Sequence, residues 1–219
     1  LSSKGYQAPP TRESDSFCER VMLMSKDAKK LAARNQNRSR TPHSKQFLKY
    51  IGSNWANTPE KLPKADPVAP YAAKRRAAVA KAFKGKVLVF EAGASKTRSN
   101  DTEYRYRPHT AFAHLTGWGS ATVAGSVLVI DARKGVKATL YFRPTAGHDT
   151  DEFFANPAIG EFWVGKRPSL KQVAALLDIK TADIKTLDAF LKDAGKKNTL
   201  DLSDASLAEF VSELRLVKD

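Results

Sequence analysis

Few features of catalytic, membrane-bound or disulfide-linked proteins occur in this sequence. One residue of 219 is a cysteine, Cys18, so no disulfide can form within the chain, and this agrees with a reducing cytosol. No apolar run approaches the roughly 18–20 residues that cross a bilayer. The longest runs, at 87–90 and 127–130, have the length of strands. We therefore expect a soluble globular protein of the cytoplasm with no membrane partner.

Motifs for metal, nucleotide and nucleophilic chemistry are also missing. His109 and His114 are five residues apart, not four as in a helical zinc motif, and no HExxH occurs. The GxSxG, GxxxxGK and GxGxxG patterns are absent too. Cys18 follows Phe17 in a segment of helical pattern, so we expect a half-buried side chain, not a nucleophile. The sequence predicts no catalytic residue and no bound metal within this chain.

Acidic residues are scarce in the first part of the chain. Residues 1–86 contain 19 Lys and Arg against 6 Asp and Glu, a net charge of +13, whereas residues 87–219 contain 18 and 17, a net charge of +1. The simpler interpretation is a solvated, lysine-rich surface. The alternative is a patch for nucleic acid or an acidic protein. Nucleic acid is the less favoured partner, because aromatic residues that could stack on bases are widely scattered there.

Three regions follow one another along the chain. Residues 1–43 are a basic extension, and apolar residues at helical spacing between 14 and 33 predict that it is mostly helical. Residues 44–70 combine a short helix at 44–51 with a proline-spaced connector from 58 that has no regular structure. Residues 71–219 form the compact domain.

Helical and strand patterns alternate within residues 71–219. The helices are expected at 72–83, 149–154, 170–177 (capped by Ser169) and 184–193 (ending at Gly195). The strands are expected at 86–92, 122–130, 137–143 and 198–202, the first of them buried on both faces. Residues 93–110 are polar and rich in turn formers. This order predicts an α/β layer fold.

Two segments stand out as candidate sites. Residues 97–107, TRSNDTEYRYR, gather three arginines, two carboxylates and two tyrosines directly after a buried strand, where α/β folds often place ligand contacts. The simpler interpretation is a surface loop rich in salt bridges. In the second segment, 161–167 (EFWVGKR), Trp163 is either a core residue or a contact for a partner or ligand.

These segments, in this order, resemble the amino-terminal, creatinase-type domain of aminopeptidase P enzymes. Residues 97–107 are similar to the family's TRS-x-D-x-EY-x-YR loop, 112–117 (FAHLTG) to its FxYLTG segment, and 161–165 to its EFWVG motif. The end, SELRLVKD at 212–219, is similar to the SEMRLVKD segment between the family's two domains. The chain departs from the pattern at His114 and Arg105, where an aromatic residue and a proline are common. The resemblance spans residues 44–219 and implies a mixed β-sheet flanked by helices.

The resemblance also implies a function. Family members are Xaa-Pro aminopeptidases, whose carboxy-terminal "pita-bread" domain holds two manganese ions with Asp, Asp, His, Glu and Glu ligands. Those ligands would lie beyond Asp219, so we expect this chain alone to be inactive. The implied partners are its own catalytic domain, further copies in a dimer or tetramer, and a peptide whose second residue is proline.

By the same resemblance, four residues are expected near the mouth of the catalytic cleft, in the same or a neighbouring subunit: Arg98, Asp101, Tyr104 and Trp163. A freestanding binding module is the alternative function. It would keep the peptidase-like fold and bind nucleic acid or acidic proteins through its basic N-terminal part.

Overall fold

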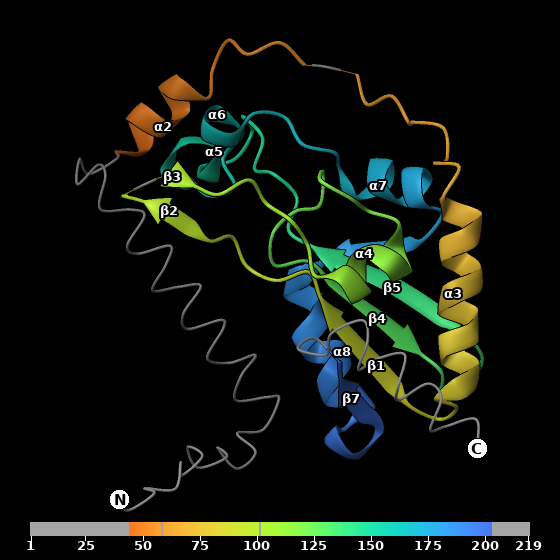
Figure 1. Ribbon diagram of the computed structural model, residues 1–219. Helices are drawn as coiled ribbons and strands as arrows, with labels where there is room; N and C mark the ends of the chain where they lie inside the picture. The colour runs from red at the N-terminus through yellow and green to blue at the C-terminus, as the bar shows by residue number, and fades with distance from the viewer. Residues whose placement is uncertain (1–43, 58, 101, 203–219) are drawn as a thin grey trace, which may run out of the picture. The chain divides into compact units, whose positions relative to one another are not determined.

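A five-stranded sheet forms the centre of the part of the chain that the computed structural model describes, residues 44–57, 59–100 and 102–202 (Figure 1). Its strands, in spatial order, are β6 (Lys180–Asp183), β5 (Lys137–Phe142), β4 (Val127–Asp131), β1 (Val87–Glu91) and β7 (Thr199–Asp201). β4 runs antiparallel to both β1 and β5, while the two outer strands are parallel to their neighbours. The prediction of a mixed sheet flanked by helices is confirmed.

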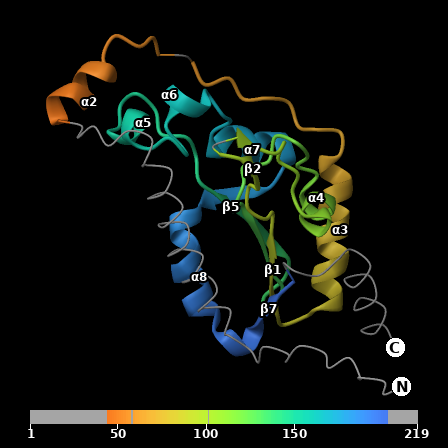
Figure 2. The ribbon, with the colours of Figure 1, turned by 60° about the vertical axis from the view of Figure 1, so that its left-hand side comes forward.

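Alternating side chains give the sheet two apolar faces. Leu88, Phe90, Leu128 and Ile130 belong to the core that also contains apolar residues of three helices. These helices are α3 (Ala69–Ala82), α4 (Thr110–Thr116) and α7 (Leu170–Leu177). Figure 2 shows α3 and α4 on one side of the sheet and α8 (Leu187–Ala194) on the other. The buried run at 87–90 therefore packs on both sides, as its continuous apolar sequence predicts.

Helix α3 begins at Ala69, three residues before the predicted start. Pro70 lies in its first turn, where the missing amide hydrogen costs no hydrogen bond. Two arginines of α3 then fix the end of α4: Arg75 Nη1 donates to the His114 carbonyl at 2.9 Å, and Arg76 Nη1 to the Leu115 carbonyl at 3.0 Å. These charged donors satisfy carbonyls that have no partner within their helix.

The short helix predicted at 44–51 is α2, Lys45–Ile51, and the Ser44 hydroxyl accepts from the Phe47 amide at 3.1 Å. The proline-spaced connector after it has no regular structure from Pro59 to Asp66, as expected. It is nevertheless anchored to α7 by three hydrogen bonds, one of them from the Ser169 hydroxyl to the Glu60 carboxylate. Gln172 Nε2 donates to the Lys61 carbonyl at 2.9 Å, and the Asp66 amide donates to the Leu176 carbonyl at 2.8 Å.

Several elements differ from the prediction. The polar segment 93–110 contains a hairpin, β2 (Thr97–Ser99) with β3 (Thr102–Glu103), and the start of α4. The strand predicted from residue 122 begins at Val127, because the Thr122 hydroxyl donates to carbonyls of the preceding turn, Trp118 at 2.9 Å and Gly119 at 2.7 Å. The helix predicted at 149–154 is α5, Glu152–Ala155, and α6, Glu161–Val164, was not predicted as a helix.

The remaining predictions have mixed outcomes. Ser169 caps α7 in a capping box with Gln172, and Gly195 ends α8, as expected. A short 3-10 helix at Ile184–Thr186 precedes α8, and β6 was missed. The predicted helix at 14–33, the resemblance at 212–219 and Asp101 lie outside the described residues, so the division at residue 43 stays a prediction. Within 44–202, no helix is long and apolar enough to span a membrane.

Trp118 gives a test of the core. Its ring is 2% exposed and meets Phe142 edge-on at 5.3 Å, but its indole N–H has no hydrogen-bond partner among the described residues. Removing an unsatisfied buried donor recovers about 1–3 kcal/mol. We therefore expect Trp118→Phe to change the free energy of unfolding by less than about 1 kcal/mol, and Trp118→Ala to lower it by about 3–5 kcal/mol. Urea unfolding of both variants measures this, and equal losses would contradict it.

Candidate functional site at one end of the sheet

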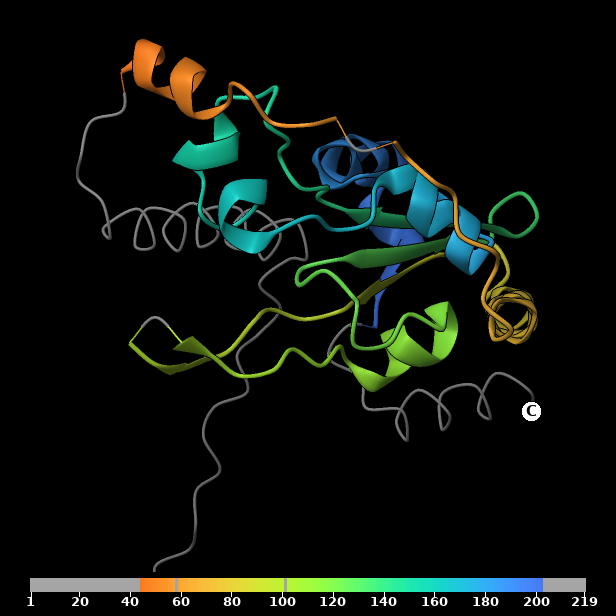
Figure 3. The same cartoon turned by 90° about the horizontal axis from the view of Figure 1, so that it is seen from above.

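The topology brings the two candidate segments to the same end of the sheet. Because β1 and β5 are both antiparallel to β4, they run parallel, and their carboxyl ends meet at one end. The β2–β3 hairpin follows β1, and the segment with α5 and α6 follows β5. Figures 1 and 3 show the hairpin and the α5–α6 segment as separate projections from this end. The structure therefore places Arg98 and Tyr104 on one projection and Trp163 on the other.

The hairpin presents its polar side chains to solvent. Thr97 pairs with Glu103 and Ser99 with Thr102, while Asn100 adopts a left-handed conformation (φ 46°) in the turn. Arg98 is exposed, and the Tyr104 side chain is 60% exposed. Asp101 lies outside the described residues, and within them no ion pair joins the arginines of the segment: Arg98, Arg105 and Arg107. The described part of the hairpin thus offers exposed cations and a phenol ring for contact.

Tyr106 fixes the base of the hairpin to the end of β1. Its hydroxyl lies 2.8 Å from the carbonyl oxygens of both Ala92 and Gly93, and its ring packs against the core. Burial raises the pKa of Tyr106 to about 12. Gly93 has a φ of 87°, which residues with side chains rarely adopt, and a Cβ there would lie 2.6 Å from His109 Nε2, so glycine is strongly favoured. The sequence indicated segment 97–107 as a candidate site but did not predict that Tyr106 anchors it, because both carbonyls belong to residues outside the segment.

Replacing Tyr106 by phenylalanine tests this anchor. The ring packing stays and each carbonyl keeps a backbone amide donor, from His109 and Gly125, but the phenol hydrogen bond is lost, so we expect the free energy of unfolding to fall by about 0.5–1.5 kcal/mol. The raised pKa gives a second readout. Below pH 10 the phenol is protonated in both states, and stability falls as pH rises toward 12, because the unfolded phenol ionises first.

Ultraviolet titration of the folded protein should therefore lose a phenol transition near pH 12 in this variant. Tyr104→Phe is the matched control, because Tyr104 is 60% exposed. We expect that variant to change neither the unfolding curve nor the transition near pH 12. An unchanged titration curve for Tyr106→Phe would contradict the anchor.

Trp163 lies on the surface of α6 and is half-exposed, at 50%. Its indole N–H donates to the Phe154 carbonyl at 2.8 Å, and its ring lies 5.2 Å from Phe154 and 5.1 Å from Phe162. The interpretation of Trp163 as a core residue is therefore wrong. The side chain is held in one orientation while half of it remains open to a ligand or partner.

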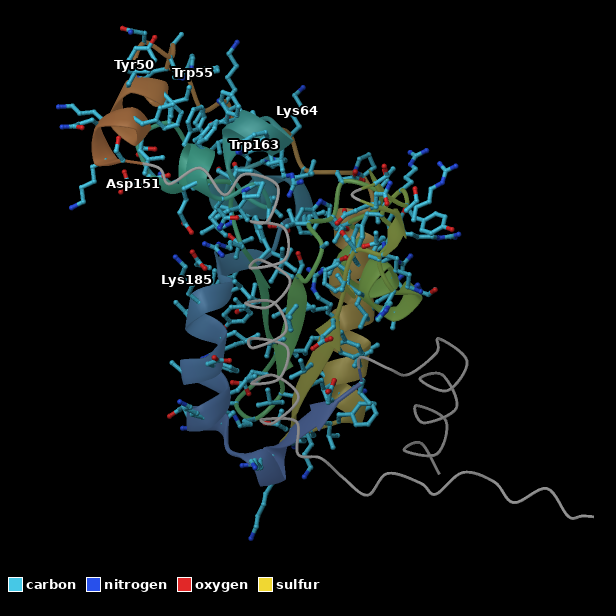
Figure 4. All side chains as sticks on the ribbon, turned by 90° about the vertical axis from the view of Figure 1, so that its left-hand side faces the viewer. Tyr50, Trp55, Lys64, Asp151, Trp163 and Lys185 are labelled. Carbon is cyan, nitrogen blue, oxygen red and sulfur yellow. The ribbon has the colours of Figure 1, made fainter. Side chains whose placement is uncertain are left out.

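Trp163 belongs to a larger aromatic cluster that also includes residues of the α2 region. Phe47 meets Phe154 at 5.3 Å, and Trp55 meets Phe153 at 5.2 Å and Phe162 at 6.3 Å. We define the aromatic cluster as Phe47, Trp55, Phe153, Phe154, Phe162 and Trp163. Figure 4 shows Tyr50, Trp55 and Trp163 gathered over α2 and α6. Sequence reasoning missed Phe47 and Trp55 as parts of the site, since about a hundred residues separate them from α6.

Polar contacts hold the cluster against the sheet. Arg143, just after β5, forms an ion pair with Glu152 of α5 at 2.7 Å, and Asn156 Nδ2 donates to the same carboxylate at 3.3 Å. Burial raises the pKa of Glu152, but the hydrogen bonds from Asn156 and Arg143 outweigh it and leave the pKa below its usual value. His148 Nε2 lies 3.0 Å from Asn57 Oδ1, which ties the chain after α2 to the same segment.

The described residues do not fit a metal centre. Among them, no group of three or more His, Cys, Asp or Glu side chains could hold a metal ion. A dinuclear site needs more ligands than that. The described residues at this end of the sheet therefore offer contact surfaces, cationic on the hairpin and aromatic on α6, without forming a metal-ligand set.

Known proteins are similar to this chain in sequence or in fold. Residues 71–202 match the family described as "Aminopeptidase P, N-terminal domain". Xaa-Pro aminopeptidase 1 of Streptomyces coelicolor is 36% identical over 80% of this chain and 39% of the relative, and Xaa-Pro aminopeptidase 2 of that organism is 32% identical over 80% and 40%. The chain spans about two fifths of these relatives. A structure of Escherichia coli aminopeptidase P with the inhibitor Pro-Leu is 19% identical, covers 68% of this chain and 32% of its own, and has a TM-score of 0.51, which shows a shared fold.

Proposed function

Because this chain belongs to the aminopeptidase P family, through the amino-terminal domain that its residues 71–202 match, we propose that it is the non-catalytic domain of a cytoplasmic Xaa-Pro aminopeptidase. There it serves substrate access and oligomer assembly. One observation carries the proposal: two exposed projections, one with Arg98 and Tyr104 and one with Trp163, leave the same end of the sheet. The side chains of Arg98, Tyr104 and Trp163 are not buried in the core, so they are available to line a cleft built by another domain or subunit.

Trp163 suits a substrate that carries proline. An indole has a large flat apolar face and few rotatable bonds, so covering a proline ring excludes water at a small cost in conformational entropy. The hydrogen bond to Phe154 already holds the ring in place before a ligand arrives. This preorganisation lowers the entropy that binding would otherwise remove.

The hairpin suits the polar end of a peptide. In the sequence, Asp101 lies between Arg98 and Arg105, and a carboxylate there can hold a substrate ammonium or an arginine of the cleft. Tyr104 adds an exposed ring on the same segment. The two manganese ions expected in the catalytic domain would polarise the scissile carbonyl, and the residues described here would orient the peptide.

The aromatic cluster suits assembly. Large aromatic side chains are enriched at the centres of protein interfaces, and Trp55 and Trp163 are each about half-exposed, at 49% and 50%. An exposed group of this kind on a folded domain marks a contact surface. The proposed partners are the catalytic domain and a further copy of the protein, in a dimer or tetramer.

The whole product of the gene that encodes this chain provides the test. We expect it to release the first residue of Xaa-Pro peptides in a manganese-dependent reaction, and not that of matched Xaa-Ala peptides. Size-exclusion chromatography with light scattering should give a dimer or tetramer. A coding sequence that stops after Asp219, or a longer product without this activity, would overturn the proposal.

The freestanding binding module is the second candidate, and the net charge of +13 in residues 1–86 is the observation that favours it. Nonspecific attraction to DNA falls steeply with salt, because binding releases counterions from phosphates. Binding lost by about 200 mM salt agrees with a solvated basic surface. Sequence-selective binding that survives such salt would favour the binding module instead.

A further inference from the structure

A pocket lies on the opposite side of the sheet from α3 and α4, and none of its lining residues belongs to the candidate site. Helix α8, which has eight residues, lies on this side of the sheet (Figure 2). The pocket encloses about 380 Å3, within the range of small-molecule sites. Its lining residues are Val129, Asp131, Val136, Lys137, Ala138, Thr139, Tyr141, Lys180 and Phe190.

The strand register places two lysines next to each other in this pocket. Thr139 of β5 pairs with Lys180 of β6, so their side chains lie on the same face. Lys137 is two residues from Thr139 and therefore on that face as well. The two lysines are diagonal neighbours on adjacent strands, a position in which like charges repel.

The only carboxylate that lines the pocket is already engaged. Asp131 accepts from Arg133 Nε at 3.0 Å and from Arg133 Nη2 at 2.9 Å. Within the described residues, no ion pair joins Lys137 or Lys180 to a carboxylate. Two lysines and one carboxylate thus line the pocket. Arg133, which pairs with that carboxylate, is also attracted by Asp193, so the excess is one positive charge, and an anionic ligand would offset it.

Apolar and aromatic groups form the rest of the wall. Val129 is fully buried at its floor, and Val136 is exposed at its rim. The Phe190 ring meets Tyr141 at 6.3 Å. The Arg133 guanidinium lies 5.8 Å above the Phe190 ring, which fixes that ring between a cation and a phenol.

We propose that this pocket binds a small aromatic carboxylate. Its carboxylate would lie between Lys137 and Lys180, close to the Thr139 hydroxyl, and its ring would pack on Phe190 and Val136. An α-ammonium group on the ligand would be disfavoured, because the excess charge around the pocket is positive. This site goes beyond the proposed peptidase role and does not depend on it.

The test titrates the 219-residue chain with 3-phenylpropionate while NMR follows the backbone amides of Val129, Thr139 and Lys180. We expect saturable shifts there. The neutral 3-phenylpropanamide, which has the same shape, should bind at least about fivefold more weakly. Lys180→Gln and Phe190→Ala should each weaken 3-phenylpropionate by a similar factor.

Lys171→Gln is the matched control. Lys171 is exposed on α7, so this substitution removes the same charge as Lys180→Gln but outside the pocket. We expect it to leave the affinity unchanged. The proposal is overturned if no saturation occurs by about 20 mM, if the amide binds as well as the carboxylate, or if Lys171→Gln weakens binding as much as Lys180→Gln.

Discussion

The 219-residue chain is expected to release no amino-terminal residue from Xaa-Pro peptides, even with manganese added. Dinuclear hydrolysis needs several carboxylate and histidine ligands on two metal ions about 3.5–4 Å apart. Among the described residues, no three such side chains form a metal-binding group. The projections at the end of the sheet can contact a peptide, but contact alone does not supply the attacking group.

The measurement compares this chain with the whole gene product at equal concentration, with manganese present and after chelation. Enzymes accelerate such reactions by about a millionfold or more, so activity in the chain should stay at the level without protein. Heat-denatured chain is the control for contaminating peptidases. Metal-dependent release by the purified chain, at a rate proportional to its concentration, would contradict the expectation.

The sheet and its main helices could be predicted from sequence because local patterns determine them. The run at 87–90 is continuously apolar because both of its faces are covered. Helix α7 was correctly placed because Ser169 marks its N-cap and apolar residues recur on one face of the helix that follows. In both cases the decisive interaction joins neighbours in the chain or depends on simple periodicity.

Other elements could not be predicted because distant residues stabilise them. Helix α4 ends on two arginines of α3 that are 39 residues away, and its own sequence has no side-chain cap. The hairpin strands are exposed, so burial leaves no alternating pattern in them. The sequence alone does not distinguish Tyr106 from other tyrosines of a polar loop, because its two carbonyl partners lie at the end of β1.

Only part of the candidate site could be predicted from the sequence. Arg98, Tyr104 and Trp163 were identified through resemblance, and the structure places them at one end of the sheet. The contribution of Phe47 and Trp55 to the aromatic cluster required the tertiary structure, because α2 packs on α5 across a long stretch of chain. Asp101 lies outside the described residues, so its role stays a prediction.

Trp163→Ala and Asp101→Asn, made in the whole gene product, are each expected to lower kcat/KM for an Xaa-Pro peptide about tenfold or more, a loss of about 1.4 kcal/mol in transition-state binding. In the 219-residue chain, Trp163→Ala should lower the free energy of unfolding by only about 1 kcal/mol, because half of the side chain already contacts water. Asp101→Asn preserves size and removes only the charge, so it should leave the unfolding curve nearly unchanged.

Tyr50→Ala is the matched control for Trp163. Tyr50 is 73% exposed on α2, near the same surface, but it is not among the segments that resemble the family's cleft. A role in substrate access requires the loss in kcat/KM to be confined to Trp163 and Asp101, and to persist at temperatures where every variant is fully folded. If Tyr50→Ala lowers kcat/KM equally, the surface acts in assembly only. If Trp163→Ala unfolds the chain, its contacts with Phe154 and Phe162 are structural, and the assignment of Trp163 to the cleft is wrong.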